Sequence, residues 1–138
     1  MSVLTGNVEP AATLAGAVAT LARLGGEGAA IAGGTWVMRG PWRGGTPNGG
    51  TPAPRRYVAL KRIPELNGWT RGADGLRLGA LLTHTNLAGI DGGPPCACII
   101  QAASRSAFPQ VRNVATIGGN IAAKGFAEAD LVPALLAA

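Results

Sequence analysis

Two short segments that each contain a glycine pair are the parts of this chain best suited to binding chemistry. They are Ala32–Thr35 (A-G-G-T) and Thr116–Asn120 (T-I-G-G-N). Glycine has no Cβ and accepts positive φ, so it lets the backbone approach an anion closely and direct N–H groups at it. The threonine and asparagine side chains can add further hydrogen bonds. Both patterns therefore predict phosphate binding by the backbone.

Each segment also has an explanation that involves no ligand. Ala32–Thr35 fits a plain turn in a glycine-rich chain, and Thr116–Asn120 fits a β-bulge with a buried asparagine. Neither is a G-x-G-x-x-G fingerprint, and neither is a P-loop, because no lysine follows the glycines. The presence of two such segments in one chain favours ligand binding over these alternatives. Together they suit a dinucleotide diphosphate held between two lobes.

The elements expected around the first segment are a helix and a buried strand. Glu9–Pro10 opens the helix, since proline is tolerated at the first helical position, and Gly25–Gly26 ends it. Its apolar side chains recur at helical spacing; they are Leu14, Val18, Leu21 and Leu24. Ala29–Ala32 is predicted to be a strand. Thr35 is placed to cap a short helical segment that runs through Met38.

The elements expected around the second segment are more numerous. Strands are predicted at Tyr57–Leu60 and Leu76–Leu82, with Asp74–Gly75 as the hairpin signal before the latter. Short helices are predicted at Thr85–Ala88, Cys96–Ser106 and Asp130–Ala138, and Gln110–Ala122 is predicted to be loop and strand. In Gly40–Pro54, nine of fifteen residues are Gly or Pro, so a surface loop is expected there.

Composition excludes several classes of protein. The 138 residues allow one domain or two small lobes, and 47% hydrophobic with 14% charged residues excludes a disordered tail. Stretches without charge, such as Pro10–Ala22, are too short for a membrane span, and no basic residue precedes the first apolar run as in a secretory signal. Cys96 and Cys98 provide too few ligands for a zinc or iron–sulfur site. We interpret them as reduced thiols of a cytoplasmic protein and expect no metal site.

The net charge of +5 is concentrated in one part of the chain. Eight of the twelve basic residues fall there: Arg39, Arg43, Arg55, Arg56, Lys61, Arg62, Arg71 and Arg77. This stretch is either a solvated face or a surface for an acidic partner, an anionic cofactor or nucleic acid. Because aromatic residues make up only 4% of the chain and no nucleic-acid-binding motif is present, nucleic acid is the least favoured of these partners.

The sequence resembles the flavin-binding (medium) subunit of the molybdenum hydroxylases, the family of xanthine dehydrogenase and carbon monoxide dehydrogenase. The matching segments are I-A-G-G-T at Ile31–Thr35, R-I-P-E-L at Arg62–Leu66, L-R-L-G-A-L-L-T-H at Leu76–His84, P-Q-V-R-N-V-A-T-I-G-G-N-I-A at Pro109–Ala122 and A-D-L-V-P-A-L-L-A at Ala129–Ala137. Their order and spacing agree along nearly the whole chain, and the fourth segment is long enough to be specific.

The resemblance implies FAD as the cofactor and a two-lobed α+β FAD-binding domain of the vanillyl-alcohol oxidase and xanthine dehydrogenase type. The residues that it places around the cofactor are Ala32, Gly33, Gly34, Thr35, Trp36, Val37, Thr116, Ile117, Gly118, Gly119, Asn120 and Asp130. The two glycine segments would hold the diphosphate, and Asp130 would face the sugar-alcohol chain. A carboxylate is a good acceptor for those hydroxyls, although Asp130 is also placed to cap the final helix.

The chain departs from the family pattern after Asn120, in a longer Gly40–Pro54 loop and in its length. After Asn120 the family has a small-residue Ser-Pro step, whereas A-A-K-G-F-A-E-A-D here is one residue longer, so the match at Asp130 depends on where that residue is inserted. The chain is also shorter than family members. We expect a first lobe at residues 1–56, a truncated second lobe at 57–138 and no C-terminal domain, as in a fragment, a truncated reading frame or a degenerate copy.

By resemblance, the function is electron transfer from [2Fe–2S] clusters through FAD to an acceptor. The partners implied are a large molybdopterin-binding subunit and a small [2Fe–2S] subunit. No acid–base or nucleophilic cluster occurs, so we predict no catalytic residue in this chain. Two other functions stay open: a non-catalytic FAD- or nucleotide-binding remnant, and a basic structural or nucleic-acid-associated domain in which the glycine pairs are only turns.

Five further residues have more than one possible role. His84, the single histidine, is either a hydrogen-bonded half-buried residue or a neighbour of the flavin ring. Arg112 is either structural or directed at a partner subunit. Trp36 and Trp69 are equally suited to covering an interface or a cofactor. Phe108 is a weaker candidate for a position near the ring.

Overall fold

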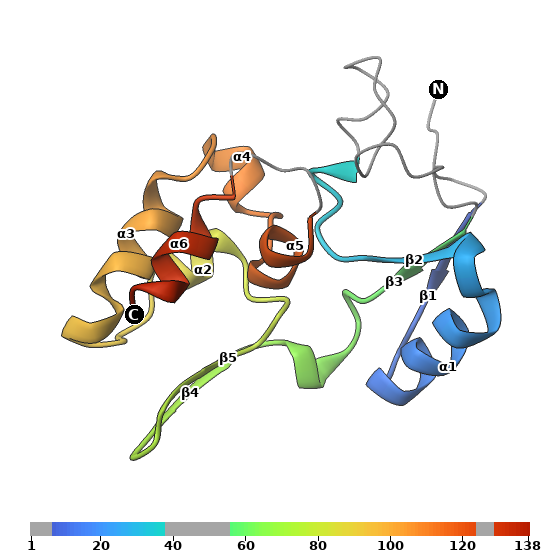
Figure 1. The fold of residues 1–138 in the computed structure, drawn as a ribbon, viewed down its shortest axis with the longest axis horizontal. Coiled ribbons are helices and arrows are strands. Elements are labelled where there is room, and N and C mark those ends of the chain that lie inside the picture. Colours follow the sequence, from blue (N-terminus) through green and yellow to red (C-terminus); the bar gives the residue numbers. More distant parts are fainter. Residues whose placement is uncertain (1–6, 38–55, 124–128) are drawn as a thin grey trace.

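The computed structural model describes residues 7–37, 56–123 and 129–138. Its first part is built on three parallel strands, β1 (Val8–Pro10), β2 (Gly28–Ile31) and β3 (Arg56–Ala59). Their order in the sheet is β1-β3-β2, so the strand that comes last in the chain lies in the middle (Figure 1). The strands predicted around Ala29–Ala32 and Tyr57–Leu60 are therefore confirmed, each one residue earlier than expected. The predicted loop Gly40–Pro54 lies outside the described residues.

Helix α1 (Leu14–Leu24) covers this sheet, but the sequence misplaced its beginning. Glu9 and Pro10 do not open the helix, because they belong to β1 and pair with Val58 and Ala59 of β3. The N-cap is Thr13, whose hydroxyl accepts a hydrogen bond from the Gly16 amide at 3.1 Å.

The buried face of α1 also differs from the predicted one. Ala17 is 1% exposed and Leu21 and Leu24 pack on the sheet, whereas Leu14 and Val18 are 44% and 59% exposed. The small Ala17 side chain allows the helix to approach the strands closely, and this rotates Leu14 and Val18 outward. The core beneath the helix consists of Ala11, Ala17, Val58 and Ile63.

One short 3₁₀ helix lies between α1 and β2, and a second 3₁₀ helix and a hairpin follow β3. The 3₁₀ segments are Gly25–Glu27 and Pro64–Leu66, and the hairpin pairs β4 (Trp69–Gly72) with β5 (Gly75–Leu78). The strand predicted at Leu76–Leu82 ends at Leu78 instead. Past that point the chain bonds elsewhere, since the Gly79 amide donates to the Gly68 carbonyl and the Leu81 amide donates to the Leu66 carbonyl, both at 2.8 Å. The sequence did not predict β4.

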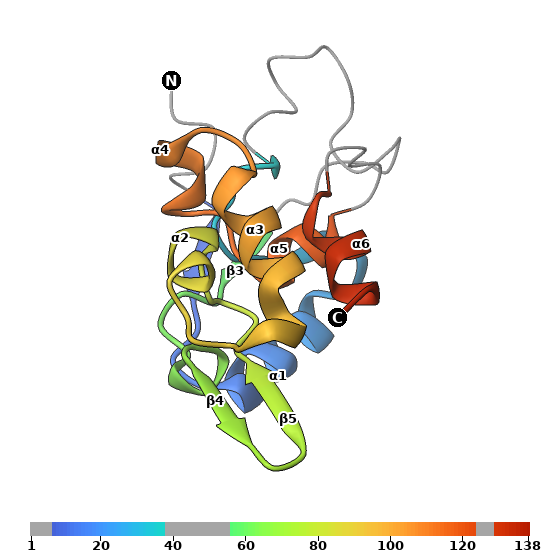
Figure 2. The same cartoon turned by 90° about the vertical axis from the view of Figure 1, so that its left-hand side faces the viewer.

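The remaining elements are helices around a second core. They are α2 (His84–Ala88), a 3₁₀ turn at Pro94–Cys96, α3 (Ala97–Arg105), α4 (Pro109–Arg112), α5 (Ile117–Ala122) and α6 (Leu131–Leu136). Figure 2 shows α3 and α6 side by side, with the β4–β5 hairpin projecting away from them. The core consists of Leu82, Leu87, Ile90, Ala103, Ile117 and Leu131. Along the described ranges, no helix is both long enough and apolar enough to cross a bilayer.

The prediction of loop and strand for Gln110–Ala122, which contains the second glycine segment, is wrong. This stretch forms the two short helices α4 and α5 instead. Pro109 occupies the first turn of α4, where its missing N–H is not needed, and the Thr116 side chain caps α5. The bridge between Thr83 and Thr116 is the strand-like part of the stretch.

The fold mixes helices and sheet around two separate hydrophobic cores, one beneath α1 and one among the later helices. This agrees with the predicted α+β class. A boundary between residues 56 and 57 would cut β3, the middle strand of the first sheet. The division into two lobes stays a prediction, and the first sheet extends to Ala59.

Candidate functional site

The two glycine segments are in direct contact. Gly33 lies against the backbone that leads into the second segment. A Cβ added to Gly33 would overlap the Val114 carbonyl oxygen and would lie 3.3 Å from Ala115 Cα. Figure 1 shows the chain after β2 passing beside α5. Gly33 is therefore required for the contact between the segments, whether or not a ligand is bound.

The first segment leaves its backbone donors unpaired. The amides of Gly33, Gly34 and Thr35 donate to no other described residue, and these residues are half-buried. Gly34 has φ of +71°, in the left-handed region that favours glycine. The segment follows the carboxyl end of β2, and ligands of parallel sheets bind at that end of the strands. Three amides and the Thr35 hydroxyl are thus available to an anion.

The second segment is held by the neighbouring segment Ala80–His84. The Gly118 amide donates to the Ala80 carbonyl at 2.8 Å, and the Ile117 amide donates to the Leu82 carbonyl at 3.0 Å. In return, the His84 amide donates to the Ala115 carbonyl at 3.0 Å. A Cβ on Gly118 would lie 2.9 Å from the Ala80 Cβ, so glycine permits this close approach. No sequence pattern indicated the role of Ala80, which lies far from the segment along the chain.

The first turn of α5 has no spare amides. The Gly119 amide donates to the Thr116 hydroxyl at 3.1 Å, and the Asn120 amide donates to the Thr116 carbonyl at 2.9 Å. Asn120 itself is 6% exposed, and its Oδ1 accepts no hydrogen bond from the described residues. An orphaned buried acceptor is costly unless a ligand or water satisfies it. Because the amides of this turn are already hydrogen-bonded, the Asn120 side chain is the group of this segment that can still accept a hydrogen bond from a ligand.

His84 is buried next to the second segment rather than half-buried as expected. It is 3% exposed, and its Nδ1 lies 2.6 Å from the Ser106 hydroxyl. The Ser106 hydroxyl also lies 3.0 Å from the Ala103 carbonyl. Which of Nδ1 and the hydroxyl donates depends on the tautomer of His84, and Nε2 has no hydrogen-bond partner among the described residues. Burial lowers the pKa of His84, while the Thr116 backbone and the Asp130 carboxylate oppose that effect.

Arg112 has a structural role in this region. Its Nη1 donates to the Ala107 carbonyl at 2.7 Å and to the Ser106 carbonyl at 3.3 Å. Ala107 has φ of +49°, a strained value for a residue with a side chain. Arg112 thus pins the turn that carries Ser106, the partner of His84. Phe108, the next residue, is 75% exposed.

Asp130 faces a cavity of about 260 Å³ that is also lined by Ser106, Gln101 and Arg105. Although Asp130 precedes α6, its side chain makes no capping hydrogen bond. The carboxylate is therefore not used to cap the helix, which was the structural alternative for this residue. A larger cavity, of about 500 Å³, contains none of the residues predicted to bind the cofactor.

The structure brings most of the predicted residues together. The first segment contacts the backbone of Val114 and Ala115, just before Thr116. The His84 amide donates to the Ala115 carbonyl, and Asp130 lies near the His84 side chain. Trp36 and Val37 continue the first segment as a turn and the start of a 3₁₀ helix, while Met38 lies outside the described residues. Unpaired amides, a buried acceptor and an uncapped carboxylate suit a ligand that carries both phosphate and hydroxyl groups. These residues therefore fit a dinucleotide.

Fold and site together define an α+β domain for a nucleotide-containing cofactor. The family described as the FAD-binding domain in molybdopterin dehydrogenase matches residues 5–138. The chain therefore belongs to the family of FAD-binding domains of molybdopterin dehydrogenases. This confirms the resemblance and the α+β FAD-binding fold, and FAD is the cofactor of the family.

Individual relatives agree with this assignment. Probable aldehyde oxidase 3 of Oryza sativa subsp. japonica is 38% identical over 87 residues, which are 60% of this chain and 6% of the relative. A reconstituted CO dehydrogenase from Oligotropha carboxidovorans is 29% identical with a TM-score of 0.69, over 83% of this chain and 38% of that chain. Quinoline 2-oxidoreductase from Pseudomonas putida 86 is 25% identical with a TM-score of 0.70, and the match covers 84% of this chain and 39% of that chain. The chain thus spans a minor part of the proteins that it matches.

Proposed function

We propose that this chain binds FAD between its two glycine segments, Ala32–Val37 and Thr116–Asn120, and serves as the flavin-binding electron-transfer component of a molybdenum-containing hydroxylase. The observation that carries the proposal is the contact of Gly33 with the backbone of Val114 and Ala115. This contact brings the unpaired amides of Gly33, Gly34 and Thr35 next to the backbone that leads into Thr116–Asn120.

The two segments have different roles in this proposal. The unpaired amides of Gly33, Gly34 and Thr35 are the donors that hold the diphosphate, because they have no other partner among the described residues. Thr116–Asn120 forms the opposite wall, fixed by its bonds to Ala80 and Leu82. The Asn120 carboxamide is the exception, since its unsatisfied Oδ1 can accept a hydrogen bond from the cofactor.

Asp130 supplies an acceptor for hydroxyl groups of the cofactor. Its carboxylate does not cap α6 and lines a cavity, so both oxygens are open to a ligand. This role has the same chemistry as the one that the resemblance implied. It predicts that the isosteric change Asp130→Asn weakens FAD binding less than loss of the diphosphate donors does, because an amide still accepts one hydrogen bond.

Bound FAD would supply the redox chemistry, accepting electrons from [2Fe–2S] clusters and passing them to an acceptor, while the protein binds and orients it. Those clusters need four ligands each, and this chain has two cysteines, both free. The proposal therefore includes a separate small [2Fe–2S] subunit and a large molybdopterin-binding subunit. The free thiols suit a reducing compartment, and we place the protein in the cytoplasm.

A basic surface is the part of the chain that we assign to subunit contacts. Lys61, Arg62, Arg71 and Arg77 are all exposed. Arg56, by contrast, forms an ion pair with Glu9 at 3.6 Å. We expect Lys61→Glu with Arg62→Glu to reduce co-purification with the two other subunits, because rim charges steer association. Unchanged assembly would remove this surface from the proposal.

The experiment that tests FAD binding is a titration of the 138-residue chain followed by flavin fluorescence. The informative variant is Thr35→Asp, which places a negative charge beside the diphosphate donors. Its matched control is Thr70→Asp on the exposed strand β4, which adds the same charge elsewhere. We expect saturable FAD binding by the wild type and the control. Thr35→Asp should bind FAD at least roughly tenfold more weakly, a loss of about 1.4 kcal/mol in binding free energy.

Circular dichroism of each protein separates loss of binding from loss of folding. Equal FAD affinity of Thr35→Asp and the wild type would contradict the assignment of the first segment. A folded wild type with no saturable binding would contradict FAD binding by this chain altogether.

A further inference from the structure

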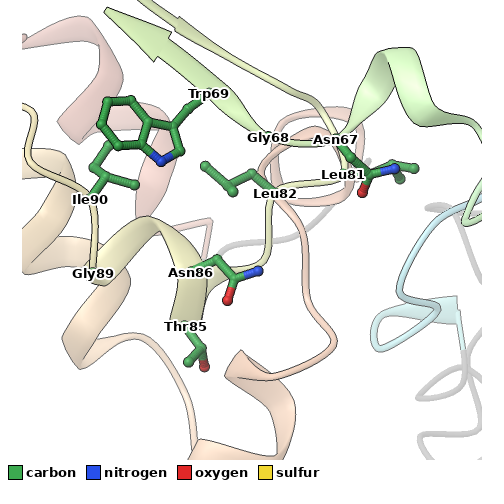
Figure 3. A pocket seen from close by; sticks show the side chains of 9 residues that line it. All are labelled: Asn67, Gly68, Trp69, Leu81, Leu82, Thr85, Asn86, Gly89 and Ile90. Atoms are coloured by element: carbon green, nitrogen blue, oxygen red, sulfur yellow. The ribbon is translucent and has the colours of Figure 1, made fainter.

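The cavity of about 500 Å³ lies between the start of the β4–β5 hairpin and helix α2, and no residue of the two glycine segments lines it. Its apolar floor is made by Leu81, Leu82 and Ile90, which are 6%, 5% and 8% exposed. Trp69 is 39% exposed, and its indole lies on the same side of the cavity as Ile90 (Figure 3). Asn67 lies on the opposite side, with Leu82 between them. The volume is that of an ordinary small-molecule pocket.

The polar groups of this cavity have unused hydrogen-bonding capacity. Asn67 Nδ2 donates to the Ile63 carbonyl at 2.8 Å, which leaves its Oδ1 as an acceptor. The Thr85 hydroxyl donates to Asn113 Oδ1 at 2.7 Å, which leaves its lone pairs. For Asn86 only the backbone groups have partners, the amide the Thr83 hydroxyl and the carbonyl the Gly89 amide, so its whole carboxamide is available. The cavity thus offers two acceptors and one group that both donates and accepts.

The lining carries no charged or titratable side chain, since its remaining members are glycines and apolar residues. An ionic ligand would leave its counter-charge in solvent and lose hydration without compensation. A neutral ligand has no such penalty. The exposed indole face adds a stacking surface for a flat ring.

We propose that this cavity binds an uncharged planar heterocycle whose edge presents a donor next to an acceptor, as in lactam and pyrimidine-type rings. The ring stacks on Trp69, and its donor–acceptor edge pairs with the Asn86 carboxamide, the geometry by which Asn recognises bases. Asn67 and Thr85 accept any second donor. This site is separate from the proposed FAD site and does not depend on it.

The test is an NMR titration of the ¹⁵N-labelled chain with thymine, which is neutral, and with orotate, which has a related ring with a carboxylate. The reporters are the Trp69 indole N–H, assigned with Trp69→Phe, and the Asn86 side-chain amide. We expect both signals to shift with thymine, with a dissociation constant of about 1 mM or tighter, and orotate to bind at least roughly tenfold more weakly.

Two variants and a competition experiment complete the design. Asn86→Leu keeps the branched shape at Cγ on an exposed helix position and removes the carboxamide, so it should weaken thymine binding, whereas Thr70→Val should not. Saturating FAD should leave thymine binding unchanged. The proposal is overturned if neither reporter shifts, if orotate binds as well as thymine, if Asn86→Leu binds normally, or if FAD displaces thymine.

Discussion

The first glycine segment, Ala32–Val37, follows a parallel strand and keeps its amides unpaired, whereas the second, Thr116–Asn120, enters a helix whose first amides all have partners. The difference comes from what lies beside each pair. Ala80–His84 runs along the second segment and accepts from the Ile117 and Gly118 amides, while Thr116 itself accepts from the next two amides. None of the described residues does this for the first. A shared apolar-Gly-Gly-polar pattern thus marks places where the chain must approach itself closely, and only the surroundings decide where donors remain for a ligand.

The largest effect should follow from breaking the contact between the segments with Gly33→Ala. The added Cβ meets the Val114 carbonyl, which is backbone and has little room to move. We expect a loss of about 3 kcal/mol in the free energy of unfolding, the upper end of the usual overpacking penalty, measured by denaturant titration. The control is Gly26→Ala, whose Cβ would meet nothing within 4 Å. Equal stability of Gly33→Ala and the control would contradict the contact.

A pair of neighbouring changes separates packing from helix propensity in the second segment. Gly118→Ala should destabilise the chain by about 1–3 kcal/mol, because its Cβ would lie 2.9 Å from the Ala80 carbonyl oxygen. Gly119→Ala should be close to neutral. Its nearest contact is the Thr116 hydroxyl at 3.0 Å, and alanine gains about 1 kcal/mol of helix propensity over glycine. Thermal unfolding of both variants tests this, and the reverse order would refute the assigned packing.

The cap of α5 should have a smaller effect. Thr116→Val removes the hydroxyl that accepts from the Gly119 amide, so we expect a loss of about 1 kcal/mol. Thr116→Ser retains the oxygen and should recover most of the stability. The measurement is the midpoint of urea unfolding at constant m-value. If Val and Ser variants are equally stable, the hydroxyl does not stabilise the second segment.

The smallest expected effect is a pH dependence from His84. Burial lowers the pKa of His84 in the folded chain below its ordinary value of 6.5. Between the lowered pKa and 6.5 the unfolded chain binds more protons, so stability falls as the pH decreases through that window and is level above it. Because the chain has one histidine, His84→Gln should flatten the profile between about pH 7.5 and about pH 5.5. A wild-type profile that is already flat would show that His84 is not buried in the neutral form.

Local signals were enough to predict much of the fold. Apolar runs bounded by glycine or proline located β2, β3, α2 and α3 to within one or two residues. The start of α1 was missed because Pro10 is equally compatible with a first helical turn and with the end of an edge strand. Only pairing with β3, from residues far along the chain, decides between these two.

The candidate site could be predicted from the sequence as a set of residues whose role stays a prediction, but its hydrogen bonds could not be. The glycine pairs and Asp130 could be singled out by residue type and by the family resemblance. That the Ile117 and Gly118 amides would donate to Leu82 and Ala80 depends on a tertiary contact with no sequence pattern. The same holds for Ser106, which orients His84 from the end of α3. Helix propensity also argued against α5, and the Thr116 cap overrode it.

The order β1-β3-β2 has a consequence for how the chain is made. A ribosome that has released residues only as far as Ile31 has delivered two of the three strands, but each of them bonds to β3 and to no other strand of its sheet. Neither ladder of this sheet can form until Arg56–Ala59 emerges, and until then α1 has no complete sheet to pack against. The sheet therefore cannot form before β3 has been synthesised. Once β3 is available, β1 and β2 can pair with its two edges.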